Sequence, residues 1–448
     1  MPEIIESSSG GRDTRILPVH GFTDCPPGQD VLRKWAAENV KGSPEVDALL
    51  AAAQAIRTSD IPVAFPTETV YGLGADATRS EAVQGIYRAK QRPSDNPLIV
   101  HVSSREQLER LLQPSETSNG AIKVHRISPI PKIYESLMER FWPGPLSIIL
   151  PNPSHLPLAP EVTANLSTFA VRMPSSPLAR LLIALADRPV AAPSANASTK
   201  PSPTTAQHVY TDLQGRIDII LDGGPCGVGV ESTVVDGLSS PPAILRPGGV
   251  GIDELRTCPG WENVQIGYKD GALQGKAIPR APGMKYKHYS PKARVVLFEA
   301  GQNNASVLNR VITDINKRSE LENGRNLSSA IGIVRTKTWK KGLGISHLPL
   351  GNVTNGADAS SSINSPTSIP IESQQISASA PSTNMLDISL GQDTSSIARG
   401  LFSALRSLDE RNVSVIYVEG ISDTEGDLAA AVMNRLRKAA EEEVKVVA

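Results

Sequence analysis

Short apolar runs alternate with helical patterns between residues 45 and 257. Residues 45–57 and 80–90 repeat apolar positions at helical spacing, with Ser80 as the expected N-cap of the second helix. Runs rich in Val, Ile and Leu end in Gly, Pro or Ser, which is typical of buried strands followed by tightly shaped loops. Such strands are expected at 61–66, 97–102, 146–150, 167–173, 188–194, 217–224, 232–237 and 243–248. The order predicts an α/β domain over 45–257 whose loops form a ligand pocket beyond the strand ends.

A second, smaller α/β pattern covers residues 293–448 and predicts a Rossmann-like domain. Its strands are expected at 293–300, 329–336 and 413–420, and its amphipathic helices at 395–410 and 426–443. Residues 351–385 contain no Lys or Arg and are rich in Ser, Thr, Asn and Pro, which predicts a disordered insertion. We expect 258–292 to be an ordered linker and 1–44 to be an N-terminal extension.

Length and charge narrow the class of protein. A chain of 448 residues exceeds the size at which one hydrophobic core stops growing, which agrees with two domains. Lys and Arg number 45 against 46 Asp and Glu, so the whole chain lacks the basic character of a dedicated polynucleotide binder. No apolar run reaches the roughly 18 residues of a membrane helix, and we expect a soluble protein that does not interact with membranes.

Cysteine and histidine spacing gives no sign of a metal or redox site. The three cysteines, Cys25, Cys226 and Cys258, are odd in number and form no CxxC pair, which favours a reducing compartment. The histidines include no i, i+4 pair, so we predict no metal ligands among the protein side chains. The first 30 residues are too acidic for a typical mitochondrial presequence, and we expect a cytoplasmic protein, with a mitochondrial share left open.

Standard nucleotide-binding motifs are absent. Gly275-Lys276 lacks the upstream Gly and the following Ser or Thr of a P-loop, and 227–232 runs into a strand instead of opening a helix. Four cationic residues instead stand at the ends of predicted elements: Lys90, Arg92, Arg172 and Arg246. Arginine forks match phosphate and carboxylate oxygens, so together these residues could clamp a polyanion. Each one taken alone is better explained as a surface ion pair.

Two polar loops allow two interpretations each. Residues 192–205 carry hydroxyl and amide groups between prolines, and they either cradle phosphates or form a solvated loop before a helix capped by Thr204 or a neighbour. Residues 66–75 combine Gly72 and Gly74 with several polar side chains, and they form either a binding loop or a plain connection. Composition does not choose between these interpretations.

Eight segments, taken in order, resemble the threonylcarbamoyl-AMP synthase family. They are PTETVYGLGA (66–75), KQRPSDNPLIVH (90–101), FWPGPLSIIL (141–150), AVRMP (170–174), APSANAS (192–198), GVESTVVD (229–236), ILRPGG (244–249) and APGMKYKHYSP (281–291). The resemblance implies a twisted, mixed-sheet YrdC-like domain with a concave basic cavity, followed by the Rossmann-like domain of the long form. It also implies that 258–292 folds over the cavity mouth.

The resemblance implies an enzyme that converts L-threonine, bicarbonate and Mg²⁺-bound ATP to L-threonylcarbamoyl-AMP and pyrophosphate. The product would pass to the tRNA threonylcarbamoyl-transferase complex, which modifies tRNA next to the anticodon. By position, the implied threonine-binding residues are Thr69, His101, Arg172, Ala192 and Ser232. The implied ATP-binding residues are Arg92, Asn96, Thr168, Ser194, Ser202, Arg246, Tyr286, Lys287 and His288. Lys90, Arg92 and Arg172 would be the catalytic cations.

The chain departs from the family pattern at two positions. Thr199 stands where Gly is usual after the APSANAS loop, and a β-branched residue adopts positive φ only at a cost. Ser147 stands where Thr is common, which is a mild change. Two other functions stay open: a double-stranded RNA or tRNA-binding module without turnover, including weak RNA binding, and carbamoyl transfer to another acceptor.

Overall fold

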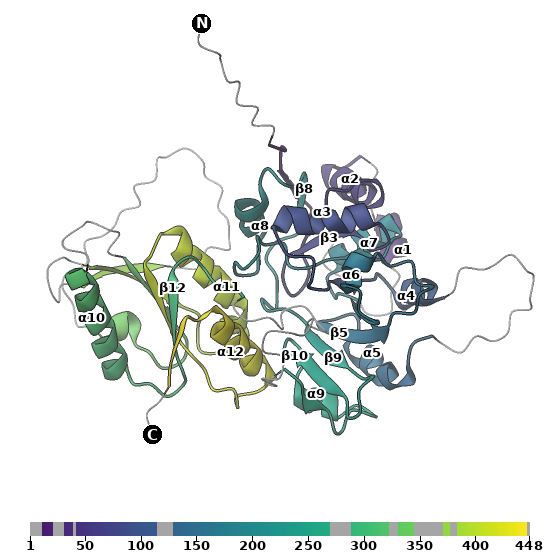
Figure 1. Ribbon diagram of the computed structural model, residues 1–448. Helices are drawn as coiled ribbons and strands as arrows, with labels where there is room; N and C mark the ends of the chain where they lie inside the picture. The colour runs from purple at the N-terminus through teal and green to yellow at the C-terminus, as the bar shows by residue number, and fades with distance from the viewer. Residues whose placement is uncertain are drawn as a thin grey trace, which may run out of the picture.

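The computed structural model describes residues 11–20, 31–38, 42–113, 129–268, 288–321, 330–344, 371–376 and 383–445. These residues form two α/β domains, each built on its own sheet (Figure 1). The larger domain, residues 11–268, has an eleven-stranded mixed sheet, and the smaller domain, residues 293–445, has a six-stranded sheet. The α/β class with two unequal domains is therefore confirmed. No helix within the described ranges is both long and apolar enough to cross a membrane.

The larger sheet has the strand order β1-β8-β2-β3-β7-β4-β6-β5-β9-β10-β11. Its strands are β1 (Arg15–Pro18), β2 (Val63–Phe65), β3 (Gly72–Asp76), β4 (Ile99–His101), β5 (Leu146–Pro151), β6 (Thr168–Arg172), β7 (Val190–Ala191), β8 (Ile219–Asp222), β9 (Thr233–Asp236), β10 (Ala243–Arg246) and β11 (Gln265–Ile266). The helices are α1 (Val31–Glu38), α2 (Pro44–Thr58), α3 (Ser80–Lys90), α4 (Arg105–Leu112), α5 (Glu135–Phe141), α6 (Pro160–Thr163), α7 (Pro177–Ala186), α8 (Ala206–Leu213) and α9 (Ile252–Arg256), with a 3-10 turn η1 (Lys132–Tyr134).

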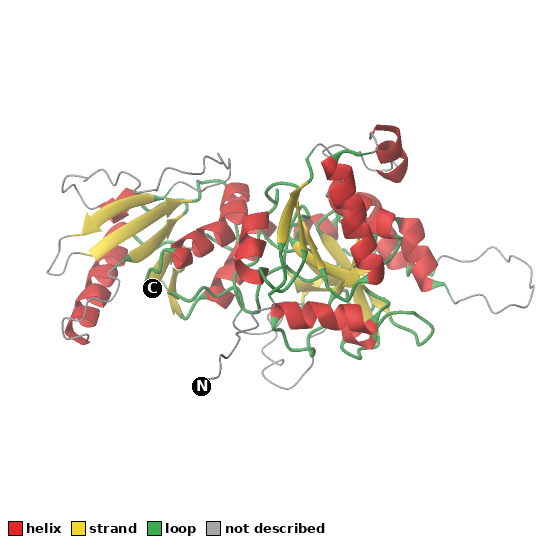
Figure 2. Cartoon of the chain, turned by 90° about the horizontal axis from the view of Figure 1, so that it is seen from above, coloured by secondary structure: helices red, strands yellow, loops and turns green. Residues whose placement is uncertain are grey.

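The smaller sheet has the order β14-β15-β13-β16-β12-β17, and its four central strands are parallel. Its elements are β12 (Arg294–Phe298), α10 (Asn304–Leu321), β13 (Ile331–Arg335), η3 (Lys341–Gly344), β14 (Glu372–Ile376), β15 (Thr383–Ser389), α11 (Thr394–Glu410), β16 (Val415–Glu419), α12 (Asp427–Ala439) and β17 (Glu442–Val444). Helix α10 covers one face of this sheet, while α11 and α12 lie on the side that faces the larger domain (Figures 1 and 2).

The segment predicted as an N-terminal extension contributes to the larger sheet. Strand β1 pairs with β8 in parallel, with Arg15 opposite Ile219, and the Thr14 hydroxyl donates to the Ile217 carbonyl at 2.5 Å. Val19 is buried in the same core as α2 and α7. The prediction for 1–44 is therefore wrong at these residues. The apolar pattern of this strand spans only four residues, flanked by charged residues and a proline, which is too short to distinguish an edge strand from an unpaired tail.

The predicted disordered insertion is also wrong in part. Glu372–Ile376 forms β14 and Thr383–Ser389 forms β15, an antiparallel pair at the edge of the smaller sheet. Strand β15 also pairs in parallel with the buried strand β13, so its backbone groups find partners that composition does not reveal. Residues 351–370 and 377–382 lie outside the described part of the chain.

Smaller differences concern the ends of elements. The loop 66–75 contains strand β3, and the expected strand 188–194 is reduced to two residues between prolines. Ser80 does not cap α3, because Arg79 is the N-cap and the Ser80 hydroxyl donates to the Glu161 carboxylate at 2.6 Å. The helix after 192–205 does begin with a threonine cap, at Thr205.

The predicted linker divides into two described parts. Residues 258–268 belong to the larger domain, because Cys258, Trp261 and Val264 are buried in its core and β11 pairs with β10. Residues 288–292 lead into β12, and the Tyr289 ring packs on Phe402 of α11 with a centroid distance of 5.2 Å. The residues between them, 269–287, lie outside the described part. Tyr268, at the end of the first part, also lies near the smaller domain, since burial and then the charges of Asp423 and Asp427 raise its pKa.

Candidate active site

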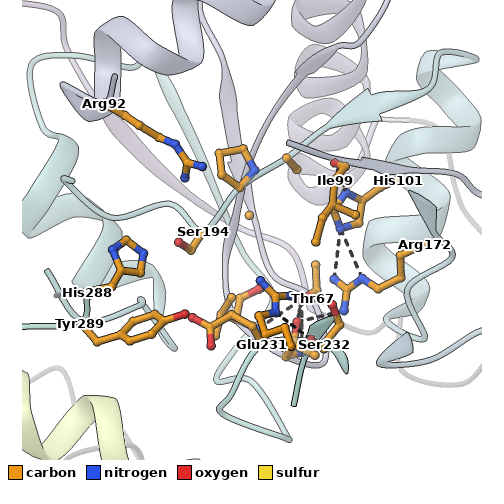
Figure 3. Close-up of a pocket in the computed structure, with 16 residues that line it drawn as sticks. Thr67, Arg92, Ile99, His101, Arg172, Ser194, Glu231, Ser232, His288 and Tyr289 are labelled. Carbon is orange, nitrogen blue, oxygen red and sulfur yellow. Dashed lines mark hydrogen bonds between the residues drawn. The ribbon is translucent and has the colours of Figure 1, made fainter. Parts of the chain in front are cut away.

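A cavity opens where loops of the larger domain meet the end of the linker, with about 570 Å³ of space when the solvent at its mouth is included (Figure 3). Its walls come from the loops after β2, α3, β7 and β8, the ends of β4, β6 and β10, and the residues before β12. Nine of the predicted site residues line it: Thr69, Arg92, His101, Arg172, Ala192, Ser194, Ser232, Arg246 and His288. The structure thus brings together residues that are up to 219 positions apart, from Thr69 to His288.

His101 and Arg172 form a pair at one end of the cavity. They are register partners in the parallel strands β4 and β6, so their side chains leave the sheet side by side. The Arg172 Nη2 and Nε donate to His101 Nε2 at 3.2 and 3.4 Å. The Arg172 Nη1 donates to Glu68 Oε1 and to the Thr69 hydroxyl, both at 3.1 Å. The guanidinium is thereby held at the wall with its charge balanced by one carboxylate.

The His101 ring is neutral in this arrangement. Its Nδ1 donates to the Ile99 carbonyl at 3.1 Å, which leaves Nε2 as the acceptor for Arg172. Burial and then the Arg172 charge lower the pKa of His101 well below its usual value. A neutral imidazole orients the arginine fork without adding a second positive charge.

Arg246 and Ser232 form a second group on the cavity wall. Arg246 Nε donates to the Ser232 carbonyl and Nη2 to its hydroxyl, both at 3.0 Å. The Ser147 hydroxyl lies 2.9 Å from the Ser232 hydroxyl, so a serine at position 147 supplies the polar contact in this group. Burial lowers the pKa of Arg246 to about 10 and leaves the guanidinium charged at neutral pH.

Arg92 contributes a cation at the opposite end of the cavity (Figure 3). Its Nη2 donates weakly to the carbonyls of Asn96 and Pro97, at 3.3 and 3.4 Å. Its Nε is buried and finds no acceptor among the described residues, and the buried Asn96 Oδ1 finds no donor among them. A buried donor without a partner is costly, so this end of the cavity is suited to an anionic ligand.

Comparison with known proteins places this site in a family. A profile described as "Telomere recombination" (Sua5/YciO/YrdC) matches residues 55–248, and one described as the C-terminal domain of threonylcarbamoyl-AMP synthase matches residues 250–441. The threonylcarbamoyl-AMP synthase of Schizosaccharomyces pombe is 45% identical over 405 residues, which cover 88% of each chain. The chain belongs to the threonylcarbamoyl-AMP synthase family. That of Bacillus subtilis is 38% identical over 408 residues, 91% of this chain and 97% of the relative.

A solved structure extends the likeness to the whole fold. The crystal structure of P. abyssi Sua5 complexed with L-threonine matches with a TM-score of 0.67 at 36% identity, and the match covers 97% of this chain and 100% of the other. The long form of the threonylcarbamoyl-AMP synthase family, with both domains, is therefore the architecture of this chain.

The remaining predicted residues of this family member lie off the cavity wall or outside the described ranges. Thr168 begins β6, and Asn96 contributes its carbonyl to Arg92. Ser202 is buried and donates to Glu231 Oε1 at 2.5 Å. Tyr286 and Lys287 lie outside the described residues.

Lys90 lies beneath the APSANAS loop and not on the cavity wall. Its Nζ donates to the carbonyl of Ser194, to the carbonyl of Asn196 at 2.7 Å and to Asn196 Oδ1 at 3.1 Å. Burial and the neighbouring Arg92 charge lower its pKa well below the usual value. In this arrangement Lys90 shapes the loop that presents Ser194 to the cavity.

Thr199 does adopt the left-handed conformation, with φ of 75°. Its carbonyl accepts a hydrogen bond from the Ser290 N–H at 2.9 Å, which ties the loop to the linker segment. A β-branched residue pays more than Gly for this backbone conformation. At this departure from the family pattern, Thr199 keeps a positive φ, and the strained backbone conformation is tolerated.

Sequence reasoning missed Glu231 and Tyr289, which both line the cavity. The Tyr289 hydroxyl points to the Glu231 carboxylate (Figure 3), and burial followed by that carboxylate raises the pKa of Tyr289 to about 12. Both residues stand inside matched segments, GVESTVVD and APGMKYKHYSP, next to residues that were selected. A carboxylate among several expected phosphate-binding arginines was the available signal.

Proposed function

We propose that this protein is a nucleotidyltransferase that makes L-threonylcarbamoyl-AMP and pyrophosphate from L-threonine, bicarbonate and ATP. The observation that carries the proposal is that one cavity of this family member has the His101–Arg172 pair at one end and Arg92 at the other. The first end suits an amino acid carboxylate, and the second suits phosphates. The intervening wall brings the two substrates within reach of each other.

Threonine binds at the end formed by Thr69, His101, Arg172, Ala192 and Ser232. The Arg172 fork receives the carboxylate, and the Thr69 hydroxyl, which already accepts from Arg172, is placed beside it. Small side chains at 192 and 232 leave room for the substrate side chain. This assignment is supported by the buried, fixed position of the arginine.

ATP binds along Arg92, Ser194 and Arg246, with His288 at the mouth. Arg92 carries the unpartnered Nε, and the Ser194 hydroxyl stands on the loop between the two arginines. Mg²⁺ enters as part of the ATP substrate, because Glu231 on the cavity wall and Glu68 behind Arg172 already have arginine partners.

The reaction follows from this placement. The neutral threonine amine forms an N–C bond to the bicarbonate carbon, and the amine proton leaves with the bicarbonate hydroxyl as water, to give an N-carboxylate. A carbamate oxygen then attacks the α-phosphorus, the new P–O bond forms, and the bond to the β-phosphate oxygen breaks to release pyrophosphate. Positioning and cations against developing charge are the main demands of such a step. Arg92 and Arg246 supply those cations.

The downstream role is inferred from the product. A carbamoyl adenylate is an activated donor, so the protein supplies the tRNA threonylcarbamoyl-transferase complex that modifies the adenosine next to the anticodon. A cytoplasmic location, with a mitochondrial share, stays a prediction.

The test is release of pyrophosphate from ATP that requires both L-threonine and bicarbonate, with mass-spectrometric detection of threonylcarbamoyl-AMP. Omission of either small substrate should abolish both signals. Arg92→Ala should abolish most turnover, while Arg110→Ala, in an exposed pair with Asp187, serves as the surface control. Salt-dependent RNA affinity without any pyrophosphate release would instead favour the RNA-binding alternative.

A further inference from the structure

Helix α12 of the smaller domain reaches the cavity wall of the larger domain through Arg435. This side chain is 1% exposed, and its Nε donates to Glu231 Oε2 at 3.0 Å. Its Nη1 donates to the Pro247 carbonyl and its Nη2 to the Glu231 carbonyl at 3.4 Å. One guanidinium of the smaller domain thereby joins the loop after β10 to the loop before β9.

Glu231 connects this contact to the cavity. Its carboxylate receives the Ser202 hydroxyl at 2.5 Å and faces the Tyr289 hydroxyl (Figure 3). The next residue along the chain, Ser232, holds Arg246. A change in the charge or position of Glu231 therefore alters the contacts of Ser202, Tyr289 and the Ser232–Arg246 pair.

A second buried ion pair between the domains provides an internal comparison. Arg406 of α11 donates to Asp212 at 2.8 and 3.2 Å, and to the Pro201 carbonyl. Arg406 and Asp212 are as deeply buried as Arg435 and Glu231, but neither lines the cavity. Among the described residues, these two buried ion pairs join the domains, and only Arg435–Glu231 includes a residue of the cavity wall.

We infer that Arg435 is a positioning residue of the active site, which acts through Glu231 to fix Ser202, Tyr289 and the Ser232–Arg246 wall. This inference rests on the proposed function of the cavity. It assigns to the smaller domain a part in turnover, in addition to docking. Loss of the guanidinium leaves the carboxylate buried and short of one partner, a costly state that protonation relieves.

The charges around Glu231 determine how its pKa changes when Arg435 is lost. Burial raises its pKa, but Arg435 and Arg246 outweigh burial and lower it to about 2. The groups that face it are Arg435 and Lys438 of α12, Arg246 of β10, Lys90 of α3, Ser202, and His288 and Tyr289 before β12. With Arg435 removed, the pKa rises, and the protonated carboxyl no longer balances the arginines of the wall.

The experiment compares Arg435→Met with Arg406→Met in the full chain. Both variants lose one buried pair between the domains, so both should lose stability. In Arg435→Met alone, kcat should begin to fall with decreasing pH about two pH units earlier than in the unaltered protein, because the pKa of Glu231 has risen. In a Glu231→Gln background, replacing Arg435 should produce no acid limb, since no carboxyl remains to titrate. Arg435→Lys should give an intermediate shift and Arg406→Lys none, and this pair decides if a Met variant does not fold.

Equal pH profiles for the Arg435 and Arg406 variants would reduce Arg435 to a docking contact and overturn the inference. Calorimetric measurement of the binding of a non-hydrolysable ATP analogue over the same pH range separates a failure of this inference from a failure of the proposed function. The affinity of Arg435→Met for the analogue should depend on pH, whereas that of Arg406→Met should not. An unaltered protein that binds the analogue but makes no adenylate contradicts the proposed function alone, and one that binds none contradicts both.

Discussion

The contact between His101 and Arg172 depends on strand register more than on either residue type. Parallel pairing of β4 with β6 places the two side chains on one face, and the hydrogen bond from His101 Nδ1 to Ile99 fixes the acceptor nitrogen. A lysine at 172 could carry the same charge, but its donors sit on a single nitrogen and lack the planar fork that reaches His101, Glu68 and Thr69 from three nitrogens. The fork geometry is therefore the property that matters at this residue.

Arg172→Lys should raise KM for threonine by about 10- to 100-fold, because a bidentate charged contact is replaced by a point charge. KM for ATP should change little, since the phosphates bind at the other end of the cavity. Steady-state pyrophosphate release at varied threonine measures the effect. Arg110→Lys on the surface is the matched control, and an equal rise in both KM values would contradict the assignment of Arg172 to threonine.

His208 gives a pH dependence of stability. Burial and then the Arg406 charge lower its pKa to about 3, and its Nδ1 accepts the Thr204 N–H at 3.3 Å. The unfolded chain has a histidine pKa of about 6.5, so below that pH the unfolded state binds the extra proton. Stability is complete above this value and declines as the pH falls, by about 2 kcal/mol between pH 7 and pH 5.

His208→Asn should remove that share of the acid sensitivity, because an amide oxygen can accept the same N–H and does not titrate. Denaturant unfolding at the two pH values measures it, and the other buried histidines cancel in the comparison. Identical pH dependences of the unfolding free energy for the two proteins would show that His208 titrates normally in the fold.

At the scale of elements, α11 packs directly against the loop 227–230. Arg399 Nε donates to the Gly227 carbonyl at 3.1 Å, and Gly229 has φ of 83° with the helix backbone close to its α-carbon. A Cβ at Gly229 would lie 2.4 Å from the Arg399 Cα. The glycine therefore serves the approach of a helix as well as the turn.

Gly229→Ala should destabilise the protein by at least about 2 kcal/mol more than Gly224→Ala, because backbone cannot yield as a side chain can. Gly224 has φ of 86° and no neighbour within 4 Å of an added Cβ, so it has only the conformational cost, about 1 kcal/mol. Thermal unfolding of the two variants gives the difference. Equal losses would mean that α11 adjusts to the extra carbon.

The elements also show what the sequence could predict. The helical period of residues 45–57 predicted α2 correctly. The eight segments that resemble the family predicted nine residues that line the cavity. Strand β3 and strand β1 were missed because short, Gly-rich or charge-flanked strands depend on neighbours far along the chain. Arg435 could not be found, since its role requires α12 to dock on another domain.

The whole molecule is held together by more than its ion pairs. Val70 and Val230 of the larger domain are buried in one apolar cluster with residues of α11 and α12, and the Thr204 and Ser403 hydroxyls lie 2.9 Å apart. The backbone N–H of His288 donates to the Lys438 carbonyl at 3.2 Å. Cavity, linker segment and α12 therefore form a continuous chain of contacts.

Threonine together with a non-hydrolysable ATP analogue should slow amide hydrogen exchange in α12 as well as around the cavity. Ligand binding raises the free energy of the openings that break these contacts. Helix α10 covers the other face of the smaller sheet and should change little, which makes it the internal control. Equal protection of both helices, or of neither, would indicate that the smaller domain does not sense the occupied cavity selectively.

The position of β1 at the outer edge of the sheet sets a limit on how far the N-terminal part of the chain can be shortened. Removal of residues ahead of Arg12 keeps its pair with Asp218 and the whole ladder from Arg15 to Pro18. A cut after Pro18 would uncover the backbone of β8, an apolar strand that could then recruit strands from other chains. A chain shortened past β1 should therefore aggregate through β8, whereas a chain shortened only upstream of Arg12 keeps this edge of the sheet covered.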